Sequence, residues 1–217
     1  MSDRHFDQLA TRFAEKIYGG AKGAIRLAVL QADLREVLPS RPLRVLDIGG
    51  GLGHMAIKLA KAMGAEVTLF TRSPGKEEDA HRLGADRVVI STDAAQMAQV
   101  AGHFHLIVDT VPYVHDLNAY IPTLRFKGSL VLVGYLGPLE PALDSMPMVI
   151  GGKAVAASMI GGMAATQEML DFCGQHDIVS DVEVIAIQDI NDAYERMLKS
   201  DVKYRFVIDM ATLDKAT

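Results

Sequence analysis

The chain has 217 residues, of which 49% are hydrophobic and 23% charged, and a net charge of −5 from 22 basic and 27 acidic residues. These values are typical of one globular domain and argue against a nucleic-acid-binding surface. A single cysteine excludes a disulfide framework, and no apolar run is long enough to span a bilayer or to serve as a leader. We therefore expect a cytoplasmic protein with no membrane or nucleic-acid partner.

The first predicted elements are two helices within residues 3–38. Apolar residues recur there at helical spacing in two stretches, which Tyr18-Gly19-Gly20 separates. Pro39 and Pro42 then end the second helix and lead into the first strand.

The stretch Arg44–Lys76 predicts a strand, a glycine turn, a helix and a second strand. The apolar run of the first strand stops at Asp47, and four of the five positions 49–53 are glycine. Glycine lets backbone N–H groups approach a phosphate or a sulfonium group, and the helix from Leu52 to Met63 directs its positive N-terminus at the same point. We therefore predict cofactor contacts from Asp47, Gly49, Gly50, Gly51, Leu52 and Gly53.

The spacing of the turn leaves two cofactors open. Asp47-x-Gly49-x-Gly51-x-Gly53 matches the D-x-G-x-G-x-G pattern of S-adenosylmethionine (SAM)-dependent methyltransferases. The dinucleotide fingerprint G-x-G-x-x-G is incomplete, because Ile48 occupies the position of its first glycine. Taken alone, the turn favours SAM.

The end of the second strand favours NADP instead. It carries no Asp or Glu that could accept hydrogen bonds from a ribose diol. Two cations beside two hydroxyls suit the 2′-phosphate of NADP. The predicted contacts at this position are Thr71, Arg72, Ser73 and Lys76. We predict NADP as the cofactor and keep SAM as the alternative.

Repeated strand and helix units follow the glycine turn. The predicted strands are Val67 to Phe70, Arg87 to Ile90, Leu106 to Asp109, Leu130 to Val133 and Val155 to Ser158. Right-handed crossovers then predict an α/β fold with a Rossmann-like, doubly wound parallel sheet in three α/β/α layers, as one domain over residues 1–217. Ligands of such sheets lie beyond the carboxyl ends of the strands. The further predicted cofactor contacts there are Thr110, Val111, Gly134, Tyr135, Ser158 and Ile160.

The C-terminal segment is predicted as a strand at Val182 to Ile187, a helix at Asn191 to Ser200 and a strand at Arg205 to Asp209. These elements either join the edge of the main sheet or leave an apolar surface that pairs two copies of the chain. A homodimer through this segment is therefore one expectation.

We predict no metal site. Cys173-x-x-His176 has a plausible ligand spacing, but an ordinary buried cysteine and a surface histidine explain it better. His103 and His105 bracket the start of a strand and are interpreted as a pair at the rim of the sheet. His54 begins the first helix after the turn and is expected to pack near the pyrophosphate.

Two family resemblances accompany these patterns. Residues 4–39, RHFDQLATRFAEKIYGGAKGAIRLAVLQADLREVLP, followed by LRVLDIGGG, resemble the bacterial tRNA wobble-uridine carboxyl methyltransferases. That resemblance implies that Arg26 helps to hold the SAM carboxylate. From Gly51 onward the phrases GLGHMAIKLAKAMGAEVTLFTRSPGK, LIVDTV, GSLVLVGYLG and INDAYERMLKSDVKYRFVID are similar to the cofactor-binding half of zinc-dependent, NADP-linked cinnamyl-alcohol and aldehyde reductases. This second resemblance implies that the strand-end residues contact the ribose, the nicotinamide ring and its carboxamide.

Two resemblances in one chain suggest a chimera joined within residues 49–58, where both families carry a glycine turn followed by a helix. The second resemblance places the zinc ligands in a segment that this chain lacks, and the first places the RNA-facing residues where reductase sequence stands. We therefore expect an engineered, non-catalytic module that retains NADP(H) binding. The alternatives are a SAM-binding module and a folded scaffold that binds neither ligand tightly.

Overall fold

The computed structural model describes residues 44–48, 53–134, 136–158, 161–198, 201–202 and 204–215. The chain divides into two compact units, Met1–Ile178 and Val179–Thr217, and each is described here by itself. The two helices predicted within residues 3–38 lie outside the described residues. Among the helices that are described, none combines the length and the apolar character needed to cross a membrane.

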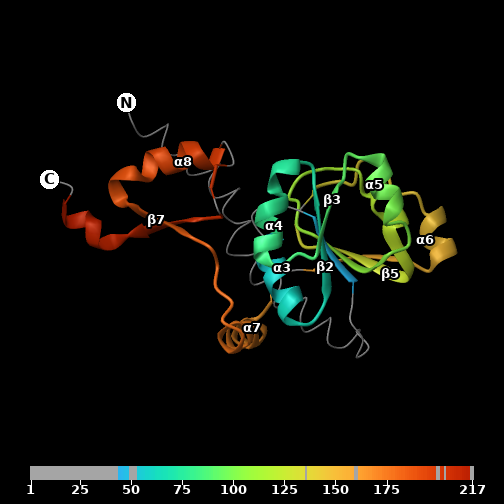
Figure 1. The fold of residues 1–217 in the computed structure, drawn as a ribbon, viewed down its shortest axis with the longest axis horizontal. Helices are drawn as coiled ribbons and strands as arrows, with labels where there is room; N and C mark the ends of the chain where they lie inside the picture. Colours follow the sequence, from blue (N-terminus) through green and yellow to red (C-terminus); the bar gives the residue numbers. More distant parts are fainter. Residues whose placement is uncertain are drawn as a thin grey trace. The chain divides into compact units, whose positions relative to one another are not determined.

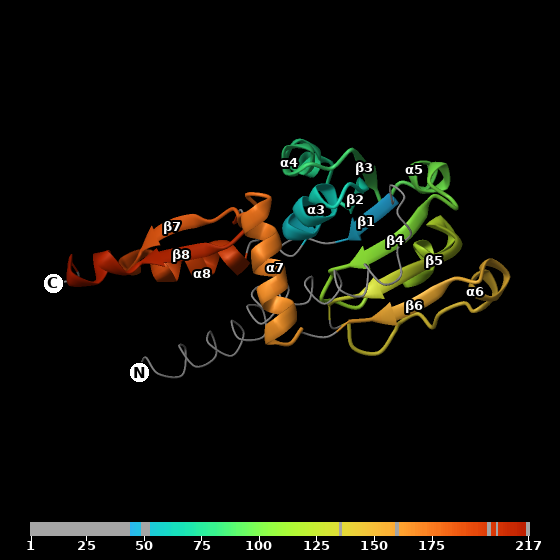
Figure 2. The same ribbon diagram turned by 90° about the horizontal axis from the view of Figure 1, so that it is seen from below.

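A six-stranded parallel sheet forms the centre of the first unit, in the order β3-β2-β1-β4-β5-β6 (Figure 2). The strands are β1 Arg44–Ile48, β2 Glu66–Thr71, β3 Arg87–Ile90, β4 Phe104–Asp109, β5 Leu124–Leu132 and β6 Ala154–Ala157. The order reverses between β1 and β4, which is where doubly wound sheets bind their ligands. The predicted Rossmann-like α/β fold is confirmed.

Helices cover both faces of this sheet (Figure 1). Helices α3 (Gly53–Ala62) and α4 (Glu77–Leu83) lie on one side, and α5 (Ala94–Gln99) and α6 (Met146–Gly151) on the other. Right-handed crossovers require this arrangement, because the chain builds outward from β1 first in one direction and then in the other. Helix α7 (Met163–Gln175) follows β6, and the short 3₁₀ turns are η1 Pro74–Lys76, η2 Leu117–Ala119 and η3 Ile121–Thr123.

Aromatic side chains anchor the core. Phe70 of β2 meets Phe104 edge to face, with ring centroids 5.7 Å apart, and lies 5.4 Å from the ring of Tyr120. Fully burying one such ring contributes about 2–3 kcal/mol to stability, and the edge-to-face contact adds about 1 kcal/mol. The remaining buried members of this cluster are Val89, Val100, Ile107, Ile121, Leu124 and Leu130. This core packs β2 and β4 against the segment that carries Tyr120.

Strand β5 differs from its prediction, because it begins at Leu124 rather than at Leu130. Leu124 pairs with Phe104, and the register resumes only where Ser129 pairs with Leu106. The intervening residues form an irregular segment in which Lys127 has φ 58°. The charged residues of this segment interrupt the apolar run, which is why the sequence pattern gives a shorter strand.

Asp86, which precedes β3, links three elements of the first unit. Its Oδ2 accepts the backbone N–H of Val67 in β2 at 2.8 Å, and its Oδ1 accepts Lys61 Nζ of α3 at 2.5 Å. Burial raises the pKa of Asp86, but the hydrogen bonds from Lys61 and Val67 outweigh it and hold the pKa below its usual value.

The second unit is a small β-α-β arrangement. Strands β7 (Glu183–Ala186) and β8 (Phe206–Asp209) pair in parallel as a two-stranded sheet of their own and do not extend the main sheet. Helix α8 (Ile190–Leu198) connects them, with η4 (Ile187–Asp189) before it and η5 (Met210–Lys215) after β8. Exposed valines remain in this unit at positions 182, 184 and 207. A homodimer through them stays a prediction.

Arg196 of α8 holds this second unit together. Its guanidinium forms a forked ion pair with Glu183 of β7, donates to Asp201 Oδ2 at 3.1 Å, and lies 4.9 Å from the ring centroid of Phe206 in β8. The forked hydrogen bond from Arg196 lowers the pKa of Glu183. One side chain thus joins the helix to both strands.

Candidate functional site

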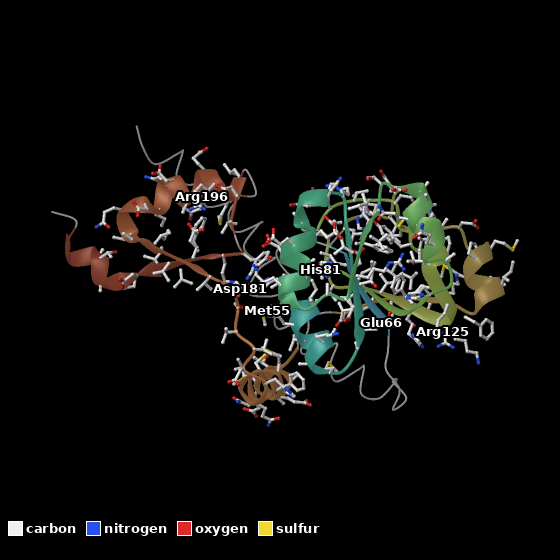
Figure 3. All side chains as sticks on the ribbon, in the orientation of Figure 1. Met55, Glu66, His81, Arg125, Asp181 and Arg196 are labelled. Atoms are coloured by element: carbon white, nitrogen blue, oxygen red, sulfur yellow. The ribbon has the colours of Figure 1, made fainter. Side chains whose placement is uncertain are left out.

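The carboxyl ends of the parallel strands meet at one edge of the main sheet. Glu66 and Arg125, near the starts of β2 and β5, mark the opposite edge (Figure 3). At the carboxyl edge, backbone hydrogen bonds join neighbouring strand ends: Ser91 N–H donates to Thr71 O at 2.9 Å, and Val133 N–H donates to Asp109 O at 2.9 Å. These hydrogen bonds fix the backbone that carries the side chains of the candidate site.

A turn after β2 presents two cations. Thr71 Oγ1 accepts the backbone N–H of Ser73 at 3.1 Å, so the threonine hydroxyl shapes the turn. Arg72 and Lys76 are exposed on either side of this turn. Within the described residues neither has a carboxylate partner. The turn thus presents two exposed cations that form no ion pair among the described residues.

The end of β4 carries a buried acid. The Asp109 side chain is 0% exposed, and its Oδ1 accepts the backbone N–H of Val111 at 3.0 Å. Its Oδ2 lies 3.1 Å from Nε2 of His115, whose side chain is 20% exposed. The other ring nitrogen of His115, Nδ1, lies 2.8 Å from the carbonyl oxygen of Tyr113.

Both ring nitrogens of His115 face oxygen atoms that only accept hydrogen bonds, a carboxylate and a backbone carbonyl. Nε2 approaches Asp109 Oδ2 at ion-pair distance, but neither atom has a partner with hydrogen-bond geometry among the described residues. The Asp109 carboxylate raises the pKa of His115, and burial and the nearby Arg72 charge oppose this only in part. Asp109 and His115 therefore form a close pair at the end of β4.

Tyr120 packs against His115 of this pair. Its ring stands edge-on to the His115 ring, with centroids 6.1 Å apart. Burial raises the pKa of Tyr120, although a hydrogen bond with Ser91 partly offsets this. The site thus draws on the ends of β2, β3 and β4 together.

The sequence-predicted residues divide into three groups. Thr71, Arg72, Ser73, Lys76, Thr110, Val111, Gly134 and Ser158 all follow or end strands at the carboxyl edge. Asp47 lies in β1, paired with Leu69 and Val108, and Gly53 is buried as the first residue of α3. Gly49, Gly50, Gly51, Leu52, Tyr135, Ile160 and Arg26 lie outside the described residues. Their assignment to a cofactor site stays a prediction.

The sequence patterns did not identify Asp109 and His115 as partners. A signal was present, because Asp109 is the one charged residue that ends the apolar run LIVD, and a charge at such a position needs a compensating group. The position of that group in the following loop depends on the loop conformation, which periodicity does not report.

The histidines and the cysteine considered as metal ligands lie in different surroundings. Cys173 is buried in α7 with its Sγ 3.6 Å from Met169 Sδ, and His176 stacks on Phe172 at 4.3 Å. His105 bonds to Arg125 near the amino end of β4. His54 is 1% exposed in the first turn of α3. Across the part of the chain that the structure describes, no three His, Cys, Asp or Glu side chains come together as a metal site.

A doubly wound parallel sheet with helices on both faces defines a Rossmann-like α/β domain. The chain belongs to the zinc-binding dehydrogenase family, whose model matches residues 51–175. The described residues do not fit a zinc site, so the family's metal has no ligand set among them.

Known relatives agree with this family. The rice (Oryza sativa subsp. japonica) protein named "Probable cinnamyl alcohol dehydrogenase 9" is 46% identical over 225 residues, which cover 95% of this chain and 62% of that protein. Aldehyde reductase YahK of Escherichia coli is 49% identical over 175 residues, 81% of this chain and 50% of that protein. This chain thus spans about half to three-fifths of the length of these relatives.

Two solved structures of related proteins are similar to this chain in three dimensions. A cinnamyl alcohol dehydrogenase from Sorghum bicolor superposes with a TM-score of 0.79 at 41% identity, covering 87% of this chain and 53% of that one. The crystal structure of CAD from Helicobacter pylori complexed with NADP(H) gives a TM-score of 0.70 at 35% identity, covering 83% of this chain and 52% of that one.

These findings correct the prediction of an engineered chimera and the prediction of a non-catalytic module. The rice relative aligns with all but about eleven residues of this chain, so most of residues 1–50 belong to the same alignment as the rest. The proposed chimera, its methyltransferase segment and its engineered origin are therefore wrong, and the SAM alternative loses its support. The expected lack of catalysis is also wrong, because the relatives are named as dehydrogenases and reductases.

Proposed function

We propose that this chain forms the NADP(H)-binding part of an alcohol or aldehyde dehydrogenase. The observation that carries the proposal is the pair of exposed cations, Arg72 and Lys76, that follows β2 at the carboxyl edge without a carboxylate partner among the described residues. In doubly wound sheets this position meets the adenosine ribose, where a carboxylate favours NAD and a cation favours NADP. The NADP(H) complexed with the Helicobacter pylori protein supports the same choice.

Arg72 and Lys76 differ in the positive potential that they offer to a phosphate. Lys76 is followed directly by Glu77, Glu78 and Asp79 in the first turn of α4, and these carboxylates reduce the positive potential around it. Arg72 stands apart from them and can donate two parallel hydrogen bonds to a phosphate. We therefore assign the larger part of 2′-phosphate recognition to Arg72.

The other predicted residues would hold the rest of the cofactor. Thr110 and Val111 after β4, Gly134 after β5 and Ser158 after β6 follow the strand order away from the β2 end, in the direction that an extended dinucleotide takes. When bound, NADPH supplies the hydride that reduces an aldehyde. The contribution of the described residues is to bind and orient that cofactor.

The test is to titrate the 217-residue protein with NADPH and with NADH and to follow the fluorescence of the nicotinamide ring. We expect Arg72→Ala to weaken NADPH binding by about tenfold or more, because a charge-assisted hydrogen bond contributes about 1.5–3 kcal/mol, and to leave NADH binding nearly unchanged. Lys76→Ala should have a smaller effect of the same kind. The matched control is Arg125→Ala, which removes an exposed arginine from the opposite edge of the sheet. Equal affinities for the two cofactors in the unmodified protein, or no saturable binding, would refute the proposal.

A further inference from the structure

The side chain of Asn118 joins two segments of the first unit, the one between β4 and β5 and the one between β5 and β6. Asn118 lies in η2 of the first segment, and its Nδ2 donates to the carbonyl oxygen of Ala142 at 3.1 Å. Its Oδ1 accepts the backbone N–H of Asp144 at 2.8 Å. One amide group therefore holds the second segment at two backbone positions.

This pair of contacts requires an amide side chain. A backbone carbonyl only accepts hydrogen bonds and a backbone N–H only donates one, so the side chain that meets both must carry a donor and an acceptor side by side. Asn118 supplies both from one short, planar group. A carboxylate in its place would still accept the N–H of Asp144, but it would turn a second acceptor toward the carbonyl oxygen of Ala142.

Both segments that Asn118 joins are anchored locally. Asp116 Oδ1 accepts the backbone N–H of Asn118 at 2.9 Å, and the neighbouring Leu117 is buried. In the other segment, Asp144 Oδ1 accepts the backbone N–H of Met146, the first residue of α6, at 2.9 Å. The hydrogen bonds thus run without a break from η2 through Asn118 to the start of α6.

The segment after β5 also carries a predicted cofactor contact. Gly134 follows β5 at the carboxyl edge, and three residues later Gly137 has φ 81° and lies beside Val114, whose Cγ2 would be 3.9 Å from an added Cβ. Residues 138–142 are exposed, so packing contributes little to their position. The bonds from Asn118 therefore restrict this exposed stretch at its far end.

We propose that Asn118 is a positioning residue that holds the segment after β5 in the shape that receives the nicotinamide end of the cofactor. The inference rests on the proposed function, in which the adenosine binds beyond β2 and the nicotinamide lies further along the strand order. Without the two bonds the exposed stretch samples other positions. Only the fraction of molecules with the correct loop then binds the nicotinamide, so its contribution to the affinity falls by that fraction.

The experiment compares two ligands of the 217-residue protein, NADPH and 2′-phospho-ADP-ribose, which lacks the nicotinamide ring. Calorimetry gives both dissociation constants, and their ratio measures how much the nicotinamide adds to the affinity. We expect Asn118→Ala to lower this ratio by about three- to tenfold, because two hydrogen bonds that restrict the loop are lost. The affinity for 2′-phospho-ADP-ribose should stay nearly unchanged.

Two further variants sharpen the comparison. Asn118→Asp keeps the acceptor for the N–H of Asp144 and removes the donor to Ala142, so it should also lower the ratio. The matched control is Asn191→Ala, the other asparagine of the chain, which is exposed on α8 of the second unit and should leave the ratio unchanged. If Asn118→Ala weakens both ligands equally, Asn118 only supports the fold and the inference is overturned.

Hydrogen exchange of the unmodified protein gives a readout that needs no variant. Mass spectrometry follows peptides that cover residues 134–145 at saturating NADPH and at saturating 2′-phospho-ADP-ribose. We expect NADPH to slow exchange in these peptides more strongly, because the nicotinamide end meets the segment that they cover. Equal protection by the two ligands would overturn the inference even if the variants failed to fold.

The outcomes separate the two proposals. If the unmodified protein binds neither ligand, the proposed function is wrong and this inference is wrong with it. If both ligands bind and the ratio is the same in Asn118→Ala, the proposed function stands and only the role of Asn118 is wrong. A ratio near one in the unmodified protein would also refute the role of Asn118 alone.

Discussion

Gly134 and Val111 bring two loops of the carboxyl edge into direct backbone contact. A Cβ atom at Gly134 would lie 2.5 Å from the carbonyl oxygen of Val111 and 2.9 Å from its carbonyl carbon. Real side chains do not approach a backbone that closely, so the loops after β4 and β5 can pack in this way only with glycine at position 134.

The first prediction concerns this contact. We expect Gly134→Ala to lower the free energy of unfolding by about 1–3 kcal/mol, because the rigid backbone of Val111 must move to admit the methyl group. Urea unfolding of the chain measures the change. Gly174→Ala is the matched control, since no described atom lies within 4 Å of its added Cβ and the residue is helical. That control should be neutral or gain up to about 1 kcal/mol. Equal effects of the two substitutions would contradict the packing argument.

The second prediction concerns Asp86, which joins α3, β2 and the start of β3. Asp86→Ala removes the acceptor of the Val67 N–H and the partner of Lys61, and we expect a loss of about 1 kcal/mol at neutral pH. Because the folded state lowers the pKa of Asp86, its stabilisation is complete above the unfolded value of 3.8 and disappears as the pH falls through the folded value. The free energies of unfolding of the unmodified protein and of Asp86→Ala should therefore differ at neutral pH and become equal in acid. A difference that persists in acid would show that the carboxylate charge is not responsible.

The third prediction concerns the second unit. Arg196→Met keeps an apolar stem near Phe206 but removes the forked pair with Glu183, and it should lower the thermal midpoint of the transition that melts this unit. Glu183→Gln should do the same, and the double variant should lose less than the sum of the two single losses. Since the folded state lowers the pKa of Glu183, the effect should fade in acid, and added salt should weaken it. Strictly additive losses would mean that the two side chains do not act as a pair.

The fourth prediction concerns the single cysteine. Burial raises the pKa of the Cys173 thiol, and the thiolate is the form that alkylating reagents attack. We expect iodoacetamide to modify Cys173 in the folded chain at least about tenfold more slowly than in the chain unfolded by guanidinium. Mass spectrometry of samples taken over time gives both rates. Equal rates would show that α7 exposes this residue.

The apolar pattern predicted the bounds of a strand correctly when a polar residue stands at each end of the apolar run. Strand β3 has its predicted bounds, since Asp86 and Ser91 enclose RVVI. Strand β7 and helix α8 also lie within a few residues of their predicted positions. Pairing was harder to predict. Strands β7 and β8 carry the same pattern whether they extend the main sheet or pair with each other, because the period of a strand does not identify its neighbour.

The site was predicted in part for a related reason. The cations after β2 are recognisable in the sequence because doubly wound sheets bind a ribose beyond the end of their second strand, and their role in this chain stays a proposal. The pairing of Asp109 with His115 depends on how the loop after β4 folds back, and no local pattern encodes that. The mistaken methyltransferase segment rested on the resemblance of residues 4–39 and on the glycine turn. Such a turn before a helix can hold a sulfonium cofactor or a pyrophosphate, so its spacing does not separate the two families.

The position of β1 has a consequence for synthesis of the chain. Among the described strands β1 leaves the ribosome first, yet it lies between β2 and β4, and its last residue, Ile48, pairs with Asp109 about sixty residues later. Until β4 emerges, one side of β1 has no partner strand and its backbone hydrogen-bonding groups stay open. The nascent protein must therefore keep an incomplete half-sheet from associating with other chains, and translation speed through residues 49–109 should influence how much of it reaches the native state.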